Sequence, residues 1–427
     1  MARAWDPARW RSVFFAIWTG QAFSLFGSQL VQFALVWWLT QTTGSATVLA
    51  GATLVALLPQ ILVAPLAGAF VDRRDRRRVM MFADGGIALA TLGLALLFAF
   101  GLAHVWHVYL ALLVRSAGGA FHWPAMQSST AMMVPERHLA RIGGLNQSLY
   151  GLSSIVAPPL GALLLAYLPM HGILAIDVAT AAMAIVPLLG LQVPRLSVDA
   201  SAATKPSVFA DFRVGFHFVA AWRPLLVIIV AAAVINLFAH PAISLLPLLV
   251  TRHFGGGAIQ LAQLESVFGI GVIVGGAVLG VWGGFKRRMV TAMLALLLQG
   301  IGFAAIGLLP ATGLGAATAA MAFTGLMNPI CNGALFAAIQ ARVPHEMQGR
   351  VLSLLASGAA AASPLGLVVA GPLADRFGVP IWYVVAGVVM VAVTLVVTAV
   401  PGVLRFETGR GPQGDAAPAP GTPQSPT

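Results

Sequence analysis

The stretch that decides the fold is Gly68-Ala69-Phe70-Val71-Asp72-Arg73-Arg74-Asp75-Arg76-Arg77-Arg78. It places five arginines between two apolar runs, 45–70 and 79–100, each of which is long enough to cross a lipid bilayer. Loops with this positive charge stay on the cytoplasmic side of a membrane. The stretch therefore predicts two spanning helices joined by a short cytoplasmic loop.

The composition of the whole chain points the same way. Of its 427 residues, 59% are hydrophobic and only 9% are charged, whereas about a quarter of the residues of a soluble domain are charged. A chain of this length cannot bury so much apolar surface in water. We expect it to be solvated by the bilayer, where only helices and closed barrels satisfy every backbone polar group.

Charged and turn residues divide the chain into twelve apolar runs. They are 12–39, 45–70, 79–100, 106–130, 142–167, 172–193, 224–250, 263–284, 289–309, 314–340, 351–373 and 380–402. The first run is too long for the core of a signal peptide, so we expect it to be a spanning helix. Twelve spans place both termini on one side of the membrane.

The basic residues give the orientation. If the amino terminus is cytoplasmic, 21 of the 24 Lys and Arg residues lie in cytoplasmic segments, Arg252 and Arg376 lie outside, and Arg115 lies within a span. The sequence thus predicts a multi-pass protein of the cell inner (plasma) membrane with both termini cytoplasmic. We expect the basic residues behind the net charge of +11 to interact with anionic lipid headgroups, and no nucleic-acid partner is expected.

The two halves of the chain repeat each other. Val134-Pro135 and Val343-Pro344 each precede, by the same spacing, an arginine and a helix rich in small residues, and Pro159-Leu160-Gly161 parallels Pro364-Leu365-Gly366. We therefore predict an all-α membrane protein whose twelve transmembrane helices form two six-helix bundles. The predicted divisions are 1–193 for the first bundle, 194–222 for a cytoplasmic connector with an amphipathic helix, 223–402 for the second bundle, and 403–427 for a disordered cytoplasmic tail.

The arginine-rich loop also carries a family resemblance. It resembles the signature Gly-x-x-x-Asp-Arg-x-Gly-Arg-Arg/Lys-Arg/Lys of the major facilitator superfamily, with Asp75 in place of the second glycine. The resemblance implies a gating loop in which Gly68 allows close helix approach and an acid latches the bundles through arginines. The residues assigned to it are Gly68, Asp72, Arg73, Arg76, Arg77 and Asp84. The alternative is a positively charged membrane anchor. A second copy at 371–378 falls on the outer side and is interpreted as a helix-end feature.

The helix predicted at 142–167 suggests a direction of transport. Its small residues resemble the antiporter motif Gly-x8-Gly-x3-Gly-Pro-x2-Gly-Gly at Gly144, Ser153, Ala157, Pro158 and Gly161. Together with Phe15-Ala16-Ile17-Trp18-Thr19-Gly20-Gln21, this resembles the drug:proton antiporter branch that includes macrolide-efflux and enterobactin-exporter proteins. The resemblance implies export, with small residues packing against the other bundle. Small-residue packing without directional meaning is the alternative.

Proton coupling requires titratable or charged groups inside the membrane. Arg115 interrupts an apolar helix, and a cation there has to face a cavity or a partner. The candidates for coupling are Arg115, Asp177 and Glu265. A structural arginine bonded to carbonyl groups, and a Glu265 that caps a helix or pairs with Arg252, are the alternatives.

Neutral polar side chains recur within the apolar runs at helical spacing. The candidates for a substrate cavity are Gln21, Ser28, Gln32, His122, Asn146, Tyr150, Asn236, Asn328 and Asn332. Such residues either line a water-filled cavity or join helices. A cavity of amides and aromatic rings suits large amphiphiles better than sugars or phosphates.

The sequence lacks the residues that several other functional classes require. Neither of the two lysines, Lys205 and Lys286, follows a glycine, so the phosphate loop of an ATPase is missing. With Cys331 as the only cysteine there is no disulfide, and no metal, cofactor or catalytic residue is expected. The sequence thus predicts a non-enzymatic, monomeric transporter, acting in the lipid bilayer on a small lipophilic substrate and protons. A siderophore or metabolite exporter, an uptake symporter, and a non-transporting receptor or membrane enzyme stay open.

Overall fold

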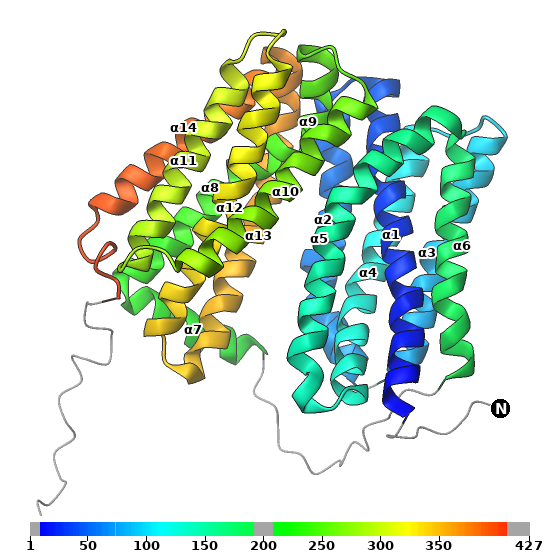
Figure 1. Ribbon diagram of the computed structural model, residues 1–427, viewed down its shortest axis with the longest axis horizontal. Helices are drawn as coiled ribbons and strands as arrows, with labels where there is room; N and C mark the ends of the chain where they lie inside the picture. Colours follow the sequence, from blue (N-terminus) through cyan, green and yellow to red (C-terminus); the bar gives the residue numbers. More distant parts are fainter. Residues whose placement is uncertain (1–8, 73, 192–207, 408–427) are drawn as a thin grey trace, which may run out of the picture.

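The protein was examined as a computed structural model that describes residues 9–72, 74–191 and 208–407 (Figure 1). The first group of long helices is α1 Trp10–Thr43, α2 Ala46–Asp72, α3 Arg76–Ala99, α4 Val105–Met133, α5 Glu136–Tyr167 and α6 Met170–Gly190. After α7 Val208–Ala221 come α8 Arg223–Ser244, α9 Leu246–Leu248, a π-helical turn Leu249–His253, α10 Ala258–Trp282, α11 Arg288–Leu308, α12 Leu314–Arg342, α13 His345–Phe377 and α14 Val379–Ala399.

Twelve of these helices are long enough to cross a membrane. Eleven of them, among the described residues, are also apolar enough by composition. The twelfth is α4, a helix of 29 residues that contains Arg115 and several polar side chains and packs against α2 and α3. The predicted all-α membrane fold is therefore confirmed.

Some helices extend beyond the predicted apolar spans into neighbouring charged residues. The helix α5 begins at Glu136 and α13 at His345, six residues before the predicted starts, and the prolines Pro135 and Pro344 stand at their N-caps. Charged residues mark where an apolar span ends, but they do not stop a helix. The predicted span 224–250 is broken after Ser244, where α8 gives way to α9 and the π-helical turn.

Two groups of helices stand side by side, α1–α6 and α8–α14 (Figure 1). Corresponding glycines make corresponding contacts: a Cβ on Gly161 of α5 would lie 2.8 Å from the Phe33 ring of α1, and a Cβ on Gly366 of α13 would overlap the Leu237 carbonyl of α8. The predicted repeat thus has a structural counterpart. In each group the fifth spanning helix lies against the first at a position where a side chain would not fit.

The contact between the two groups is concentrated on two helix pairs, α2 with α13 and α5 with α10. At one end, the Asp375 carboxylate of α13 accepts hydrogen bonds from the Ala46 amide at 2.7 Å and the Thr47 amide at 2.9 Å. It also accepts from the Ser45 and Thr47 hydroxyls. A carboxylate thereby satisfies the free N–H groups at the start of a helix in the other half. The predicted helix-end feature at 371–378 is a contact between the halves.

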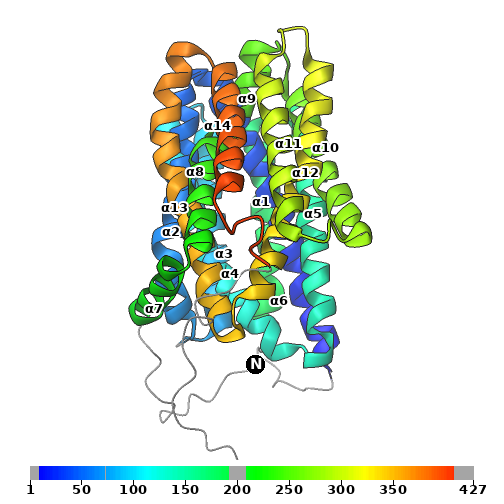
Figure 2. The same ribbon diagram turned by 90° about the vertical axis from the view of Figure 1, so that its left-hand side faces the viewer.

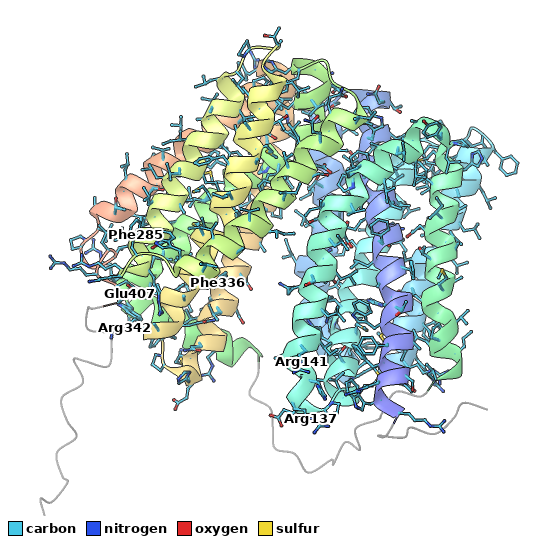
Figure 3. The ribbon with its side chains drawn as sticks, in the orientation of Figure 1. Arg137, Arg141, Phe285, Phe336, Arg342 and Glu407 are labelled. Atoms are coloured by element: carbon cyan, nitrogen blue, oxygen red, sulfur yellow. The ribbon has the colours of Figure 1, made fainter. Side chains whose placement is uncertain are left out.

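Basic side chains lie at the opposite end of both groups. Figure 3 shows Arg137 and Arg141 at the end of α5 where α1 also begins, and Arg342 towards the corresponding end of α12. At this end the ribbons of the two groups diverge (Figure 1), whereas they converge at the end that holds Asp375. The charge asymmetry of the sequence is therefore an asymmetry between the two ends of the fold.

The helix α7 and the residues after α14 both pack on the second group. The helix α7 contacts α8 and α13 at the divergent end (Figure 2). The Phe406 side chain is 1% exposed and stacks on Trp222 with ring centroids 4.5 Å apart, and Arg288 lies 3.9 Å from Glu407. Residues 403 to 407, predicted to begin a disordered tail, are therefore ordered. The rest of that tail and residues 194–207 of the predicted connector lie outside the described residues, and the described part of the connector holds α7.

Candidate functional site

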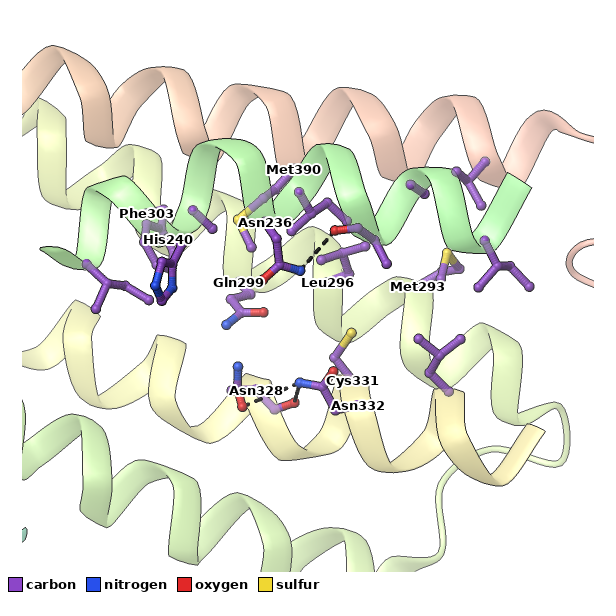
Figure 4. Close-up of a pocket in the computed structure, with 18 of the residues that line it drawn as sticks. Asn236, His240, Met293, Leu296, Gln299, Phe303, Asn328, Cys331, Asn332 and Met390 are labelled. Atoms are coloured by element: carbon purple, nitrogen blue, oxygen red, sulfur yellow. Dashed lines mark hydrogen bonds between the residues drawn. The ribbon is translucent and has the colours of Figure 1, made fainter. Parts of the chain in front are cut away.

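Each group of helices contains a cavity. The first has a volume of about 740 Å³ and is lined from α1–α6, and the second has a volume of about 200 Å³ and is lined from α8, α10, α11, α12 and α14. Predicted cavity residues that line the first are Gln21, Ser28, His122, Asn146 and Tyr150. Those that line the second are Asn236, Asn328 and Asn332 (Figure 4), and Gln32 lines neither.

Several lining residues were missed from the sequence. They are amides within apolar runs: Gln60, Gln127 and Gln147 in the first cavity and Gln299 in the second. Figure 4 places Gln299 across from Asn328, with His240 and Phe303 towards one side. An isolated glutamine in an apolar helix is the signal that would have identified them, because an unpaired amide in contact with lipid is costly.

An intramembrane ion pair lies next to the first cavity. The Arg115 guanidinium on α4 contacts the Asp177 carboxylate on α6, and their side chains are 9% and 1% exposed. Arg115 also donates to the Thr91 hydroxyl at 2.6 Å, and Asp177 accepts from the Ser28 hydroxyl at 3.1 Å and the Thr91 hydroxyl at 3.2 Å. Two predicted coupling residues, separated by 62 positions, therefore share one network built from four helices.

Asp84 belongs to a second polar network in the same cavity. Gln21 Nε2 donates to Asp84 Oδ2 at 2.8 Å, and His122 Nε2 lies 3.4 Å from Asp84 Oδ1. Its place in the sequence predicts that Asp84 acts with the arginines of the gating loop. The structure instead brings it together with two predicted cavity residues.

The predicted gating loop caps the carboxyl end of α6. Arg77 donates from Nε to the Leu188 carbonyl and from Nη2 to the Leu189 carbonyl, and Arg76 Nη1 lies 2.7 Å from Met132 Sδ. Asp75, which replaces the usual glycine, is the N-cap of α3 and accepts from the Arg77 amide at 3.2 Å. A Cβ on Gly68 would meet no described atom within 4 Å, so the close approach predicted there is not present. The structure does not describe the side chain of Asp72 or any part of Arg73.

Glu265 lies apart from both networks, on α10. It lines neither cavity. Arg252, its predicted alternative partner, is 4.0 Å from Asp375, and the N-terminal capping of α10 is done by Gly257 and Gln260. The Tyr383 hydroxyl of α14 is buried and has no hydrogen-bond partner among the described residues.

The small residues of α5 face two ways. Gly161 packs on Phe33 of α1, within its own group, while the contact with α10 is made around Ile155, whose carbonyl accepts from the Ser266 hydroxyl at 2.8 Å. A Cβ on Gly144 would meet no described atom within 4 Å. The helix α5 does pack against the other half, and the hydrogen bond described there is made by Ile155, which lies between the motif positions Ser153 and Ala157.

Comparison with known proteins gives the family. The sequence profile of the Major Facilitator Superfamily matches residues 17–367. The chain belongs to this superfamily. Membership agrees with the two repeated six-helix groups and with the loop at 68–78, and it makes the protein a multi-pass membrane transporter and not an enzyme. Among the described residues, no group of three metal-binding side chains is found.

Two relatives place this superfamily member beside drug-efflux proteins. Macrolide efflux protein A of Streptococcus pyogenes is 33% identical over 387 residues, which cover 91% of this chain and 95% of that protein. The multidrug efflux pump Tap of Mycolicibacterium fortuitum is 29% identical over 405 residues, with 90% and 95% covered. The predicted resemblance to drug-efflux members of the superfamily is therefore confirmed.

Solved structures agree in fold at much lower identity. The nucleoside transporter NupG has a TM-score of 0.72 at 11% identity, covering 90% of this chain and 98% of that one. A bacterial homologue of the iron transporter ferroportin, in an inward-facing state, has a TM-score of 0.71 at 13% identity, covering 91% and 99%. These similarities support the transporter fold alone, since superfamily members of this fold carry different cargoes.

Proposed function

We propose that this superfamily member exports bulky lipophilic compounds, including macrolide-like drugs, in exchange for protons by alternating access. The observation that carries the proposal is the end-to-end similarity to macrolide efflux protein A, at 33% identity over 95% of that protein. The first cavity supports it, because its lining combines neutral amides with Trp18, Trp123 and Tyr150. Such a lining suits a large amphiphile.

The proposed moving bodies are residues 1–193 and 223–402, which act as one monomeric transporter in the inner membrane. The support is that most helix contacts lie within each group, whereas α2 with α13 and α5 with α10 provide most of the contact between them. The proposed orientation has both termini in the cytoplasm, which puts the arginine-rich end inside and Asp375 outside. In this arrangement the cavity is closed towards the outside by the Asp375 contact.

The pair Arg115–Asp177 is proposed to couple protons to this movement. A proton on Asp177 removes the charge that holds Arg115, so α4 and α6 lose their ionic link while Ser28 and Thr91 lose a charged partner. Glu265, on α10 of the second half, is the remaining coupling candidate. The loop 68–78 is proposed to latch the inner end when the halves meet there.

The test uses inside-out membrane vesicles that trap a pH-sensitive dye and are energised to acidify their interior. Exchange predicts that added erythromycin enters the vesicles and that the interior becomes less acidic. Vesicles with the Arg115→Gln variant and vesicles without the transporter are the controls. A response to siderophores alone would move the cargo to the metabolite class. Uptake by whole cells without any vesicle response would contradict export.

A further inference from the structure

Asp84 lines the larger cavity. Among the described contacts, its carboxylate has no guanidinium partner. Arg115 lines the same cavity, but its charge is taken up by Asp177. Asp84 is held by Gln21, a neutral amide, and faces a histidine. A buried carboxylate without a fixed cation is costly unless a cation or a proton arrives to neutralise it.

His122 is placed to carry that proton. Its Nε2 atom is 3.4 Å from Asp84 Oδ1, close enough for an ion pair, yet it has no hydrogen bond of normal geometry among the described residues. The imidazole is 19% exposed, against 6% for the Asp84 side chain, and it lines the cavity. Histidine is the side chain whose charge ordinarily changes between pH 5 and 8.

Aromatic rings stand around the same space. Trp18 is fixed by donating from Nε1 to Asn146 Oδ1 at 2.8 Å, and Trp123 meets Tyr150 edge to face with centroids 5.4 Å apart. All four side chains line the cavity. A carboxylate beside fixed aromatic rings is the arrangement by which proteins bind organic cations.

The other helices around the site add no competing charge among the described lining residues. The helix α1 contributes Gln21, α2 contributes Gln60 and α5 contributes Asn146 and Tyr150. The helix α4 contributes Arg115 in addition to His122, and α6 supplies the Asp177 that neutralises this arginine. The charge available to a ligand is therefore that of Asp84, and it is adjusted by His122.

We propose that Asp84 anchors a lipophilic organic cation, such as a protonated amine of the cargo, and that protonation of His122 expels it. The proposal rests on the proposed export function and specifies its cargo. When His122 takes a proton from cavity water at Nε2, the imidazolium pairs with Asp84 and the cation leaves. When a cation binds Asp84, that proton returns to water, so that one positive charge is exchanged for another.

The test uses the purified transporter and tetraphenylphosphonium, a permanent lipophilic cation that has no proton to release. Its neutral counterpart, triphenylphosphine oxide, reports whether the cavity is intact. Binding is measured at pH 5.5 and 7.5 for the wild type and for Asp84→Asn, His122→Gln and Gln32→Ala. The last variant is the matched control, because Gln32 lies on α1, as Gln21 does, but lines neither cavity. Proton release on addition of the cation is followed in weak buffer.

We expect the wild type to bind the cation about ten-fold more weakly at pH 5.5 than at pH 7.5, since the charge of a histidine side chain changes between pH 5 and 8. Asp84→Asn should bind it at least ten-fold more weakly at pH 7.5, while His122→Gln should bind it equally at both pH values and release no proton. Binding of the neutral probe, and cation binding by Gln32→Ala, should not change.

Three outcomes would overturn the inference: no cation binding by the wild type, wild-type affinity in Asp84→Asn, or pH dependence that persists in His122→Gln. A variant that also loses the neutral probe has lost its cavity, and Asp84→Glu then replaces Asp84→Asn, with retention of cation binding expected. Failure of erythromycin transport in vesicles would contradict the proposed export function, whereas the binding measurements with tetraphenylphosphonium would be unaffected.

Discussion

The two cavities are built from corresponding helices, yet they differ in charge. The first contains Arg115, Asp84 and His122, with Asp177 directly behind it. Among the described residues that line the second, none is Asp, Glu, Lys or Arg, and its polar groups are the amides around Asn328 and the imidazole of His240. Under the proposed mechanism, the first half would respond to protons and cations, and the second would provide neutral hydrogen bonds.

The largest effect is expected from breaking the charge network of the first half. Arg115→Gln leaves the Asp177 carboxylate 1% exposed and without its ionic partner, and removing one member of a buried pair costs about 3–5 kcal/mol. We expect a large drop in thermal unfolding temperature and at least a ten-fold loss of drug efflux, measured in detergent and in cells.

The matched control is the double variant Arg115→Gln with Asp177→Asn, which removes both charges. It should recover much of the stability but not the transport, because neutral amides can bond to Ser28 and Thr91 without responding to protons. Full transport by the double variant would show that the pair is structural.

A smaller effect is expected where the two halves meet. Asp375→Ala removes the acceptor for the amides of Ala46 and Thr47 and for two hydroxyls, and should weaken that end by about 1–3 kcal/mol. Spin labels at positions 137 and 342, at the divergent end, should then move closer together as the closed end opens. An unchanged distance between the labels would contradict the proposal that the two halves move as separate bodies.

The second cavity should respond more weakly to substitution. Asn236 donates to the Ala232 carbonyl at 2.9 Å and presents its remaining polar atoms to the cavity (Figure 4). Asn236→Leu removes one neutral hydrogen bond, so KM should rise about two- to five-fold with kcat nearly unchanged. Loss of all transport in this variant would mean that the second half also carries part of the coupling.

The smallest effect is expected at Cys331, a buried free thiol in the wall of the second cavity. In Cys331→Ser the hydroxyl can bond to a carbonyl one turn earlier in α12, so the stability should change by less than about 1 kcal/mol. Unchanged melting and transport would make this variant the cysteine-free background for the spin-label measurement. A marked loss of affinity would instead identify the thiol as a cargo contact.

The sequence predicts this fold well, because the bilayer requires every span to be apolar and the cytoplasmic loops to be basic. It also identifies Arg115 and Asp177 one by one, as rare charges in apolar helices. It cannot join them, since their pairing depends on how α3 packs against both α4 and α6. The same limit explains Asp84: its place next to the loop in sequence suggested a latch, whereas the helix face it occupies turns it towards Gln21 and His122.

The contact of Asp375 with the start of α2 is another feature that sequence distance conceals, because it joins residues more than 300 positions apart. Its consequence concerns the energy supply of the cell. A passage open at both faces would let protons return without doing work and would drain the gradient on which every other secondary carrier depends. Under the proposed exchange mechanism, the Asp375 contact would help to hold one face shut and so keep an idle carrier electrically silent.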